Sequence, residues 1–161
     1  MQRLVHRAYE KNLTIQPHTA HWIFDETVFF NTICDDDTVE EIAEASYTQG
    51  DAAHVYTFTV DSIANREDLP ADDIAASDIQ EIWGEDVDVA ALIEDGDGED
   101  EVEDGGWHIQ RIRSQIARRA GYEGVYDWDE QGEIVTVDFT GRNEELNARW
   151  VYLGEYEDIR A

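Results

Sequence analysis

The stretch GGWHIQRIRSQIARRAGYEGVYDWDEQGEIVTVDF, residues 105–139, decides the fold. Its first half has apolar residues near helical spacing and predicts an amphipathic helix over residues 107–119. Gly121 is a natural residue for the helix C-terminus, and arginines in the last turn suit the helix dipole. Its second half predicts two strands joined by the turn DEQG. The side chains expected on the apolar face of the helix are Trp107, Ile109, Ile112 and Ile116.

Charge separates this stretch from the rest of the chain. The 161 residues include 39 acidic and 11 basic side chains, which give a net charge of −28, and Lys11 is the single lysine. Three interpretations fit: solubility in a high-salt host, mimicry of a nucleic acid, or an ordinary acidic surface. Direct nucleic-acid binding is disfavoured, because it needs outward-facing clusters of Lys and Arg. Four arginines nevertheless lie on the predicted helix: Arg111, Arg113, Arg118 and Arg119.

The whole chain, residues 1–161, predicts one α+β domain with a hydrophobic core, since 42% of its residues are hydrophobic. Thr38 and Glu41 form a capping box that predicts the start of a helix. Two short helices, residues 76–83 and 86–94, and an acidic glycine-rich loop form a helical insert over about residues 63–105. Strands are expected at Gln2–His6, Val28–Phe30, His54–Val60 and residues 148–156.

The cysteine content and the absence of long apolar runs indicate the cellular compartment in which the protein is found. Cys34 is the only cysteine, so no intrachain disulfide can form and a reducing compartment fits. The N-terminus has no apolar signal core, and no apolar run is long enough to span a bilayer. We therefore expect a cytoplasmic protein, placed in the host cytoplasm if a virus or plasmid encodes it.

Two carboxylate or histidine patterns suggest metal binding only weakly. His18 and His21 have a spacing that could seat a metal ion, but no further cluster of ligands accompanies them. Asp95 and Asp97 have the spacing of a calcium loop, but Asp100 stands where that loop requires glycine. We therefore expect no metal site.

Two stretches carry a resemblance to a known family. The start RLVH and the run WHIQRIRSQIARRAGYEGVYDWDEQG resemble the ADP-ribosyltransferase fold of the diphtheria-toxin and poly(ADP-ribose) polymerase branch. Within that branch they are most similar to the small type I-F anti-CRISPR ADP-ribosyltransferases. The shared pattern comprises Trp107, Gln110, Arg111, Arg113, Arg119, Gly121, Tyr122, Val125, Asp129, Glu130 and Gly132.

This resemblance implies a split β-sheet core and a set of site residues. His6 matches the first-strand histidine beside the NAD ribose. Phe29 stands where the family usually has a tyrosine that bounds the nicotinamide pocket, and Tyr47 is the candidate to stack on nicotinamide. Asp129 matches the catalytic carboxylate. Arginines near the site would pair with the NAD pyrophosphate, so at least some of the helix arginines are expected to offset the acidic field near the cofactor or the target.

Elementary chemistry agrees with a carboxylate in that role. Cleavage of the bond between nicotinamide and ribose leaves an oxocarbenium-like centre, as in glycoside hydrolysis. A carboxylate can stabilise the developing positive charge and accept a hydrogen bond from the ribose 2′-hydroxyl. Nicotinamide needs no general acid to leave, so one carboxylate suffices.

The resemblance implies an NAD-dependent mono-ADP-ribosyltransferase that modifies a host protein, such as a CRISPR effector subunit, and so counters host defence. It implies no direct contact with nucleic acid or membrane. One alternative is a non-catalytic acidic DNA mimic that inhibits a nucleic-acid-binding partner. Another is an inactive member of the fold, because Arg7 and Ala8 follow His6 where relatives have Gly-Ser/Thr, and Phe29 replaces the usual tyrosine. Saturable NAD binding separates the first alternative from the enzyme, and NAD turnover separates the second.

The charge balance predicts a dependence of stability on salt. Salt relieves self-repulsion, because the Debye length falls to about 10 Å near 0.1 M and about 3 Å near 1 M. If the acidity is an adaptation to a high-salt host, the melting temperature will keep rising into the molar range. Melting curves over a salt series measure this, and a flat melting temperature from about 0.1 to 3 M would contradict it.

Overall fold

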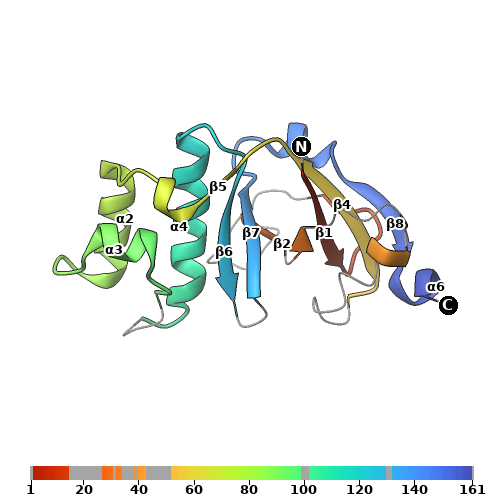
Figure 1. The fold of residues 1–161 in the computed structure, drawn as a ribbon, viewed down its shortest axis with the longest axis horizontal. Helices are drawn as coiled ribbons and strands as arrows, with labels where there is room; N and C mark the ends of the chain where they lie inside the picture. The colour runs from red at the N-terminus through yellow and green to blue at the C-terminus, as the bar shows by residue number, and fades with distance from the viewer. Residues whose placement is uncertain are drawn as a thin grey trace.

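Two separate β-sheets and a layer of helices make up the computed structural model (Figure 1). The model describes residues 2–14, 27–30, 32–33, 38, 40–42, 52–98, 102–129 and 132–160. Residues 27–30, 32–33, 129, 132 and 160 are described by their backbone alone. The α+β class predicted from the sequence is confirmed.

The first sheet, sheet A, has the strand order β3-β1-β4-β8, and its neighbouring strands are antiparallel. Its central pair is in register with Leu4 opposite Phe58 and His6 opposite Tyr56. A bulge between Val55 and Tyr56 shifts the register of the edge strand. The strands are β1 (Gln2–Ala8), β3 (Thr32–Ile33), β4 (His54–Val60) and β8 (Val151–Glu155).

The second sheet, sheet B, has the order β2-β7-β6-β5. β6 and β7 form the predicted hairpin, in which Asp129 pairs with Gly132 across a two-residue loop. The strands are β2 (Thr27–Phe30), β5 (Ile63–Ala64), β6 (Gly124–Asp129) and β7 (Gly132–Asp138). β5 runs parallel to β6, so the segment predicted as a helical insert begins as a strand of this sheet.

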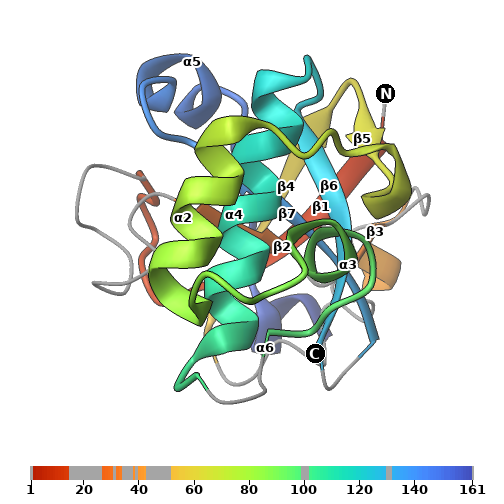
Figure 2. The same ribbon diagram turned by 90° about the vertical axis from the view of Figure 1, so that its left-hand side faces the viewer.

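Three α-helices, α2, α3 and α4, cover the face of sheet B that points away from sheet A (Figure 1). α4 lies directly against β6 and β7, and α2 and α3 form an outer layer on it (Figure 2). The elements are the 3₁₀ helix η2 (Arg66–Asp68) and the α-helices α2 (Asp73–Trp83), α3 (Val89–Glu94), α4 (Gly105–Arg119), α5 (Asn143–Asn147) and α6 (Tyr156–Arg160). None of the described helices is both long and apolar enough to span a membrane.

Local sequence signals explain several element ends. Asp72 and Asp88 cap α2 and α3, because their side chains accept hydrogen bonds from Ala75 N at 2.7 Å and Ala91 N at 3.1 Å. Thr38 acts as the predicted cap, since its Oγ1 accepts from Glu41 N at 3.3 Å.

Other sequence predictions about the elements were wrong in detail. The first strand runs on to Ala8, and the last strand ends at Glu155, where α6 begins. Trp107 was expected on the apolar face of α4 but is 42% exposed. At about 100° per residue, it lies nearly opposite Ile109 and Ile116 on the helix.

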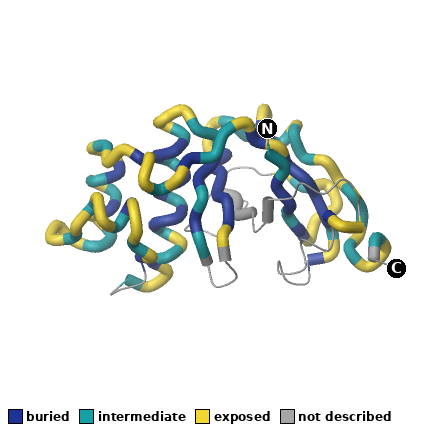
Figure 3. Tube along the Cα trace, in the orientation of Figure 1, coloured by how far each residue is buried: buried dark blue, intermediate teal, exposed yellow. Residues whose placement is uncertain are grey.

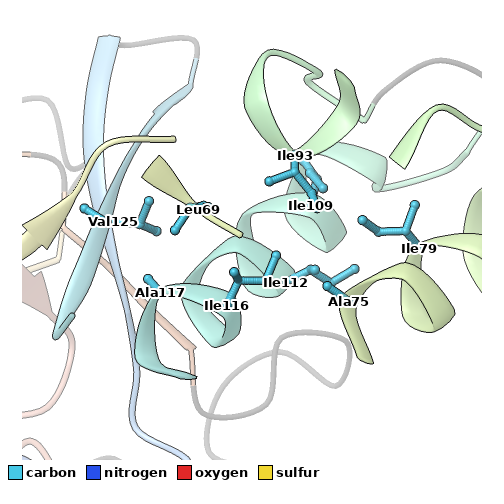
Figure 4. Packing of buried hydrophobic residues seen from close by; sticks show 10 residues of the cluster. Leu69, Ala75, Ile79, Ile93, Ile109, Ile112, Ile116, Ala117 and Val125 are labelled. Atoms are coloured by element: carbon cyan, nitrogen blue, oxygen red, sulfur yellow. The ribbon is translucent and has the colours of Figure 1, made fainter. Parts of the chain in front are cut away.

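Two main clusters of buried side chains hold these layers together (Figure 3). One joins the facing sides of the two sheets, with Leu4 and Phe58 from sheet A and Val135 and Val137 from sheet B. The other fills the space between α4, the outer helices and β6 (Figure 4). Its members include Ile79 from α2, Ile93 from α3, Ile109, Ile112 and Ile116 from α4, and Val125 from β6.

A buried arginine ties the second cluster together. Arg113 is 0% exposed, and its Nη1 donates to both carboxylate oxygens of Asp127 at 2.9 and 3.1 Å. Its other nitrogens donate to carbonyl oxygens at and beyond the end of α3: Nε to Ile93 at 2.8 Å, and Nη2 to Leu92 at 2.7 Å and to Gly96. All three guanidinium nitrogens of Arg113 therefore have acceptors. Arg113 therefore fixes α3, α4 and β6 relative to one another.

Burial and charge attraction shift the pKa values of these two groups in opposite directions. Burial raises the pKa of the Asp127 carboxyl and lowers the pKa of the Arg113 guanidinium, while the attraction between the two charges acts in the opposite direction on each. A buried pair of this kind gains little over apolar residues, but the loss of one partner leaves an unpaired buried charge.

We therefore expect Arg113→Met to be strongly destabilising. It should lower the free energy of unfolding by about 3–5 kcal/mol, because Asp127 and the carbonyl oxygens at the end of α3 would lose their donors. Arg119→Met is the matched control on the same helix, since Arg119 binds Asp72 at 2.7 Å with both side chains partly exposed. The control should cost about 1 kcal/mol or less. Equal losses in urea denaturation of the two variants would contradict the structural role of Arg113.

Candidate functional site

Two residues of the predicted site lie in strands of different sheets. His6 lies in β1 of sheet A, and Asp129 is the last residue of β6 in sheet B. Both strands point toward the same end of the molecule (Figure 1). Phe29 lies in β2 of sheet B, at the register position opposite Thr136. Tyr47 lies outside the described residues.

His6 belongs to the face of sheet A that looks toward sheet B. Alternate residues of a strand share a face, and Leu4, two residues before His6, packs in the cluster between the sheets. The imidazole of His6 is half-buried, and its centroid lies 5.5 Å from that of Trp150. Trp150 also packs on Tyr56 and Phe58, with centroid distances of 5.8 and 4.9 Å. An aromatic wall, consisting of His6, Tyr56, Phe58 and Trp150, therefore lines this side of sheet A.

The hydroxyl of Tyr56 organises the chain that follows His6. Tyr56 is only 2% exposed, and burial raises the pKa of its phenol. Its Oη donates toward the carbonyl oxygens of Glu10, at 2.7 Å, and Lys11, and it accepts from Leu13 N at 3.2 Å. Because Tyr56 pairs with His6 across β1 and β4, it holds the connection after β1 against the wall that contains His6.

Partly exposed polar groups extend the aromatic wall toward the edge of sheet A. Tyr152 of β8 is 37% exposed, and its ring lies 5.2 Å from that of Tyr56. Its hydroxyl is 2.9 Å from Nδ1 of His54. Planar rings with polar edges suit a ligand that carries aromatic bases and ribose hydroxyls, and NAD has both. The partly exposed side chains that could hold it on this side are His6, His54, Trp150 and Tyr152.

On sheet B, the end of β6 is packed against the helices. The indole of Trp128, the residue before Asp129, lies beneath the guanidinium of Arg66 at 3.7 Å and near that of Arg113 at 5.0 Å. The N–H of Trp128 donates to Oδ1 of Asp127 at 2.9 Å. Contacts on the helix side of the sheet therefore hold the two residues of β6 that precede Asp129.

Three of the four helix arginines pair with carboxylates of the protein itself, and the expectation that some of them offset the acidic field near the cofactor or the target stays a prediction. α4 covers the face of sheet B that points away from sheet A (Figure 1). Arg113 binds Asp127, and Arg119 binds Asp72. Arg118 binds Asp138 at 3.3 Å and the carbonyl oxygen of Thr140. These arginines neutralise the protein's own carboxylates, because the helix lies between acidic residues of α2, β6 and β7.

Among the residues described by the structure, no His, Cys, Asp or Glu side chains gather in a group of three or more that could hold a metal ion. His18 and His21 lie outside the described residues. Asp95 follows the last residue of α3 as its C-terminal cap, and the next residue, Gly96, is an acceptor for Arg113.

Sequence reasoning missed Tyr56, Trp150 and Tyr152 as candidate residues. Tyr56 stands in a strand with period-two alternation, where an aromatic side chain indicates packing rather than binding. Trp150 and Tyr152 lie beside it only because β8 pairs with β4 from the far end of the chain. The pairing of strands so distant in sequence left no local signal to find.

Comparison with known proteins supports the fold. A solved structure described as the crystal structure of an anti-CRISPR protein matches with a TM-score of 0.54 and 22% sequence identity. The match covers 84% of this chain and 88% of that chain. No protein-family model matches the sequence, and no curated protein does. The fold of this protein therefore resembles that of an anti-CRISPR protein.

Removal of the Tyr56 hydroxyl tests whether this group holds residues 10–13 in place. Tyr56→Phe should lower the free energy of unfolding by about 1–2 kcal/mol, because the N–H of Leu13 would lose its acceptor. Tyr152→Phe, which removes an exposed hydroxyl from a ring that packs on Tyr56, should leave the stability unchanged. Chemical denaturation measures both. An unchanged stability in Tyr56→Phe would mean that its hydroxyl does not hold residues 10–13.

Proposed function

We propose that this protein is an NAD-dependent mono-ADP-ribosyltransferase that modifies a protein of a host defence system, such as a CRISPR effector subunit. The observation that carries the proposal is the joint placement of His6 and Asp129. They come from different sheets, are 123 positions apart in the sequence, and belong to strands that point toward the same end of the molecule (Figure 1).

Two further observations support the proposal. The fold resembles that of an anti-CRISPR protein, which favours a defence protein as the target. The half-buried imidazole of His6 stands beside the rings of Trp150 and Tyr56, where a nucleotide base or ribose could pack.

The chemistry assigned to the residues is a substitution at the ribose carbon that carries nicotinamide. The glycosidic bond breaks, and nicotinamide leaves with the bonding electron pair, which neutralises its ring. Asp129 stabilises the positive charge that develops on the ribose. A nucleophilic side chain of the target protein then forms the new bond to that carbon and releases its proton. His6 binds and orients the ribose.

A second candidate function is inhibition by an acidic surface without catalysis. The chain contains no lysine or arginine from Glu67 to Gln110, a stretch that includes α2, α3 and the first turns of α4. Such a surface could occupy a basic channel that normally holds nucleic acid. The exposed acidic side chains of this stretch include Asp73, Glu81, Glu85, Asp86, Asp88, Glu94, Asp95 and Asp97.

Two measurements separate the candidates. An enzyme binds NAD saturably and transfers label from NAD to a protein in a host lysate. A nucleic-acid mimic binds a basic partner without NAD, and its affinity falls steeply as salt rises, because screening removes the long-range attraction.

The carboxylate assignment predicts the effect of Asp129→Ala. The variant should fold normally and lose transfer activity by roughly 100-fold or more, because the charge on the ribose would no longer be stabilised. The measurement is incorporation of labelled ADP-ribose into the target, with circular dichroism to verify folding. Glu133→Ala is the matched control, because Glu133 is an exposed carboxylate on the neighbouring strand.

The control should retain wild-type activity. Near-normal transfer by a folded Asp129→Ala protein would refute the role of Asp129. Equal losses in both variants would point to a general effect of charge on binding of the target.

A further inference from the structure

The peptide unit that joins Trp128 to Asp129 is held by a side chain from α4. Nε2 of Gln110 donates a hydrogen bond to the carbonyl oxygen of Trp128 at 2.8 Å. That carbonyl and the N–H of Asp129 belong to one planar peptide unit. The hydrogen bond therefore acts directly on the orientation of the backbone that carries Asp129.

The other side of Trp128 is held independently. Its N–H donates to Asp127 Oδ1 at 2.9 Å, and Asp127 is fixed in turn by Arg113. Arg66 lies over the indole and donates to the carbonyl oxygen of Tyr126 at 3.1 Å. These contacts fix the chain before Asp129, whereas the hydrogen bond from Gln110 is the described side-chain contact on the peptide unit that leads into it.

Stability alone does not explain a glutamine at this position. Gln110 is only 7% exposed, and its Oε1 is buried with no hydrogen-bond partner. A buried acceptor without a partner destabilises the folded state and offsets what the Nε2 hydrogen bond contributes. An apolar side chain of the same length would avoid this cost. What distinguishes Gln110 from an apolar residue of that length is its donor to the Trp128 carbonyl oxygen.

We infer that Gln110 is a positioning residue that sets the orientation of Asp129 for the transfer reaction. This inference rests on the proposed function. Gln110 donates to the carbonyl oxygen of Trp128 and not to the carboxylate of Asp129 in the described contacts. It acts through the Trp128–Asp129 peptide unit, so its loss should affect the rate of the chemical step and leave NAD binding intact.

The test is Gln110→Met, which keeps the length of the side chain and removes the donor. Its kcat should fall about 10- to 100-fold while the KM for NAD stays within about twofold, as expected for a misplaced catalytic group. The melting temperature should be unchanged or higher, because the unpaired oxygen is removed as well. Gln115→Met is the matched control on the same helix, at a partly exposed position, and should keep wild-type kcat.

A second measurement does not depend on activity. In ¹⁵N-labelled protein, the amide resonance of Asp129 should shift and its hydrogen exchange should speed up in Gln110→Met but not in Gln115→Met. An unchanged Asp129 amide would overturn the inference, as would a shifted amide with unchanged kcat.

The melting temperatures of two Gln110 variants distinguish a positioning role from a structural role. A lower melting temperature in both Gln110→Met and Gln110→Leu, or failure of both to fold, would make Gln110 a structural residue and overturn the inference. If the wild-type protein transfers no ADP-ribose, the proposed function fails. In that case the Asp129 amide would still show whether Gln110 holds the peptide unit.

Discussion

The buried ion pair between Arg113 and Asp127 is the contact on which the arrangement of sheet B and its helices depends. A guanidinium removed from water must find an acceptor for each N–H, and Arg113 finds them in a strand and at the end of a helix. α3 and β6 are therefore held to α4 by one side chain. The apolar cluster around it supplies the burial, but dispersion and hydrophobic contacts alone would permit α3 to slide along α4.

The same side of sheet B supports the candidate site from behind. Asp129 ends β6, and the residues before it are fixed by Asp127, Arg66 and Gln110 on the helix side. His6 and the aromatic wall belong to the other sheet, and the two sheets meet through a separate apolar cluster. The candidate site thus combines two rigid halves, so the precision of each half is set by its own packing.

The arginines have a structural role that follows from the charge of the protein. With a net charge of −28, carboxylates that approach one another in the folded state need local cations. Arg113, Arg118 and Arg119 of α4 meet carboxylates of β6, β7 and the start of α2. Arg149 likewise binds Glu123 at 2.7 Å and Glu145 at 3.3 Å. Positive charge collects on α4 because this helix lies among the acidic ends of its neighbours.

The sequence by itself determined the local elements: the hairpin around DEQG, the strand His54–Val60, the Thr38 cap and the helix that carries the arginines. Each has a short-range cause, such as alternation, helical spacing or capping. Only the tertiary structure decided that Arg113 is buried, that Ile63–Ala64 joins sheet B, and that Trp150 and Tyr152 lie beside Tyr56. For the candidate site, the sequence named His6 and Asp129, whereas the aromatic wall and the hydrogen bond from Gln110 required the fold. Contacts between residues far apart in the chain depend on how whole sheets and helices pack, and spacing along the sequence carries no record of that packing.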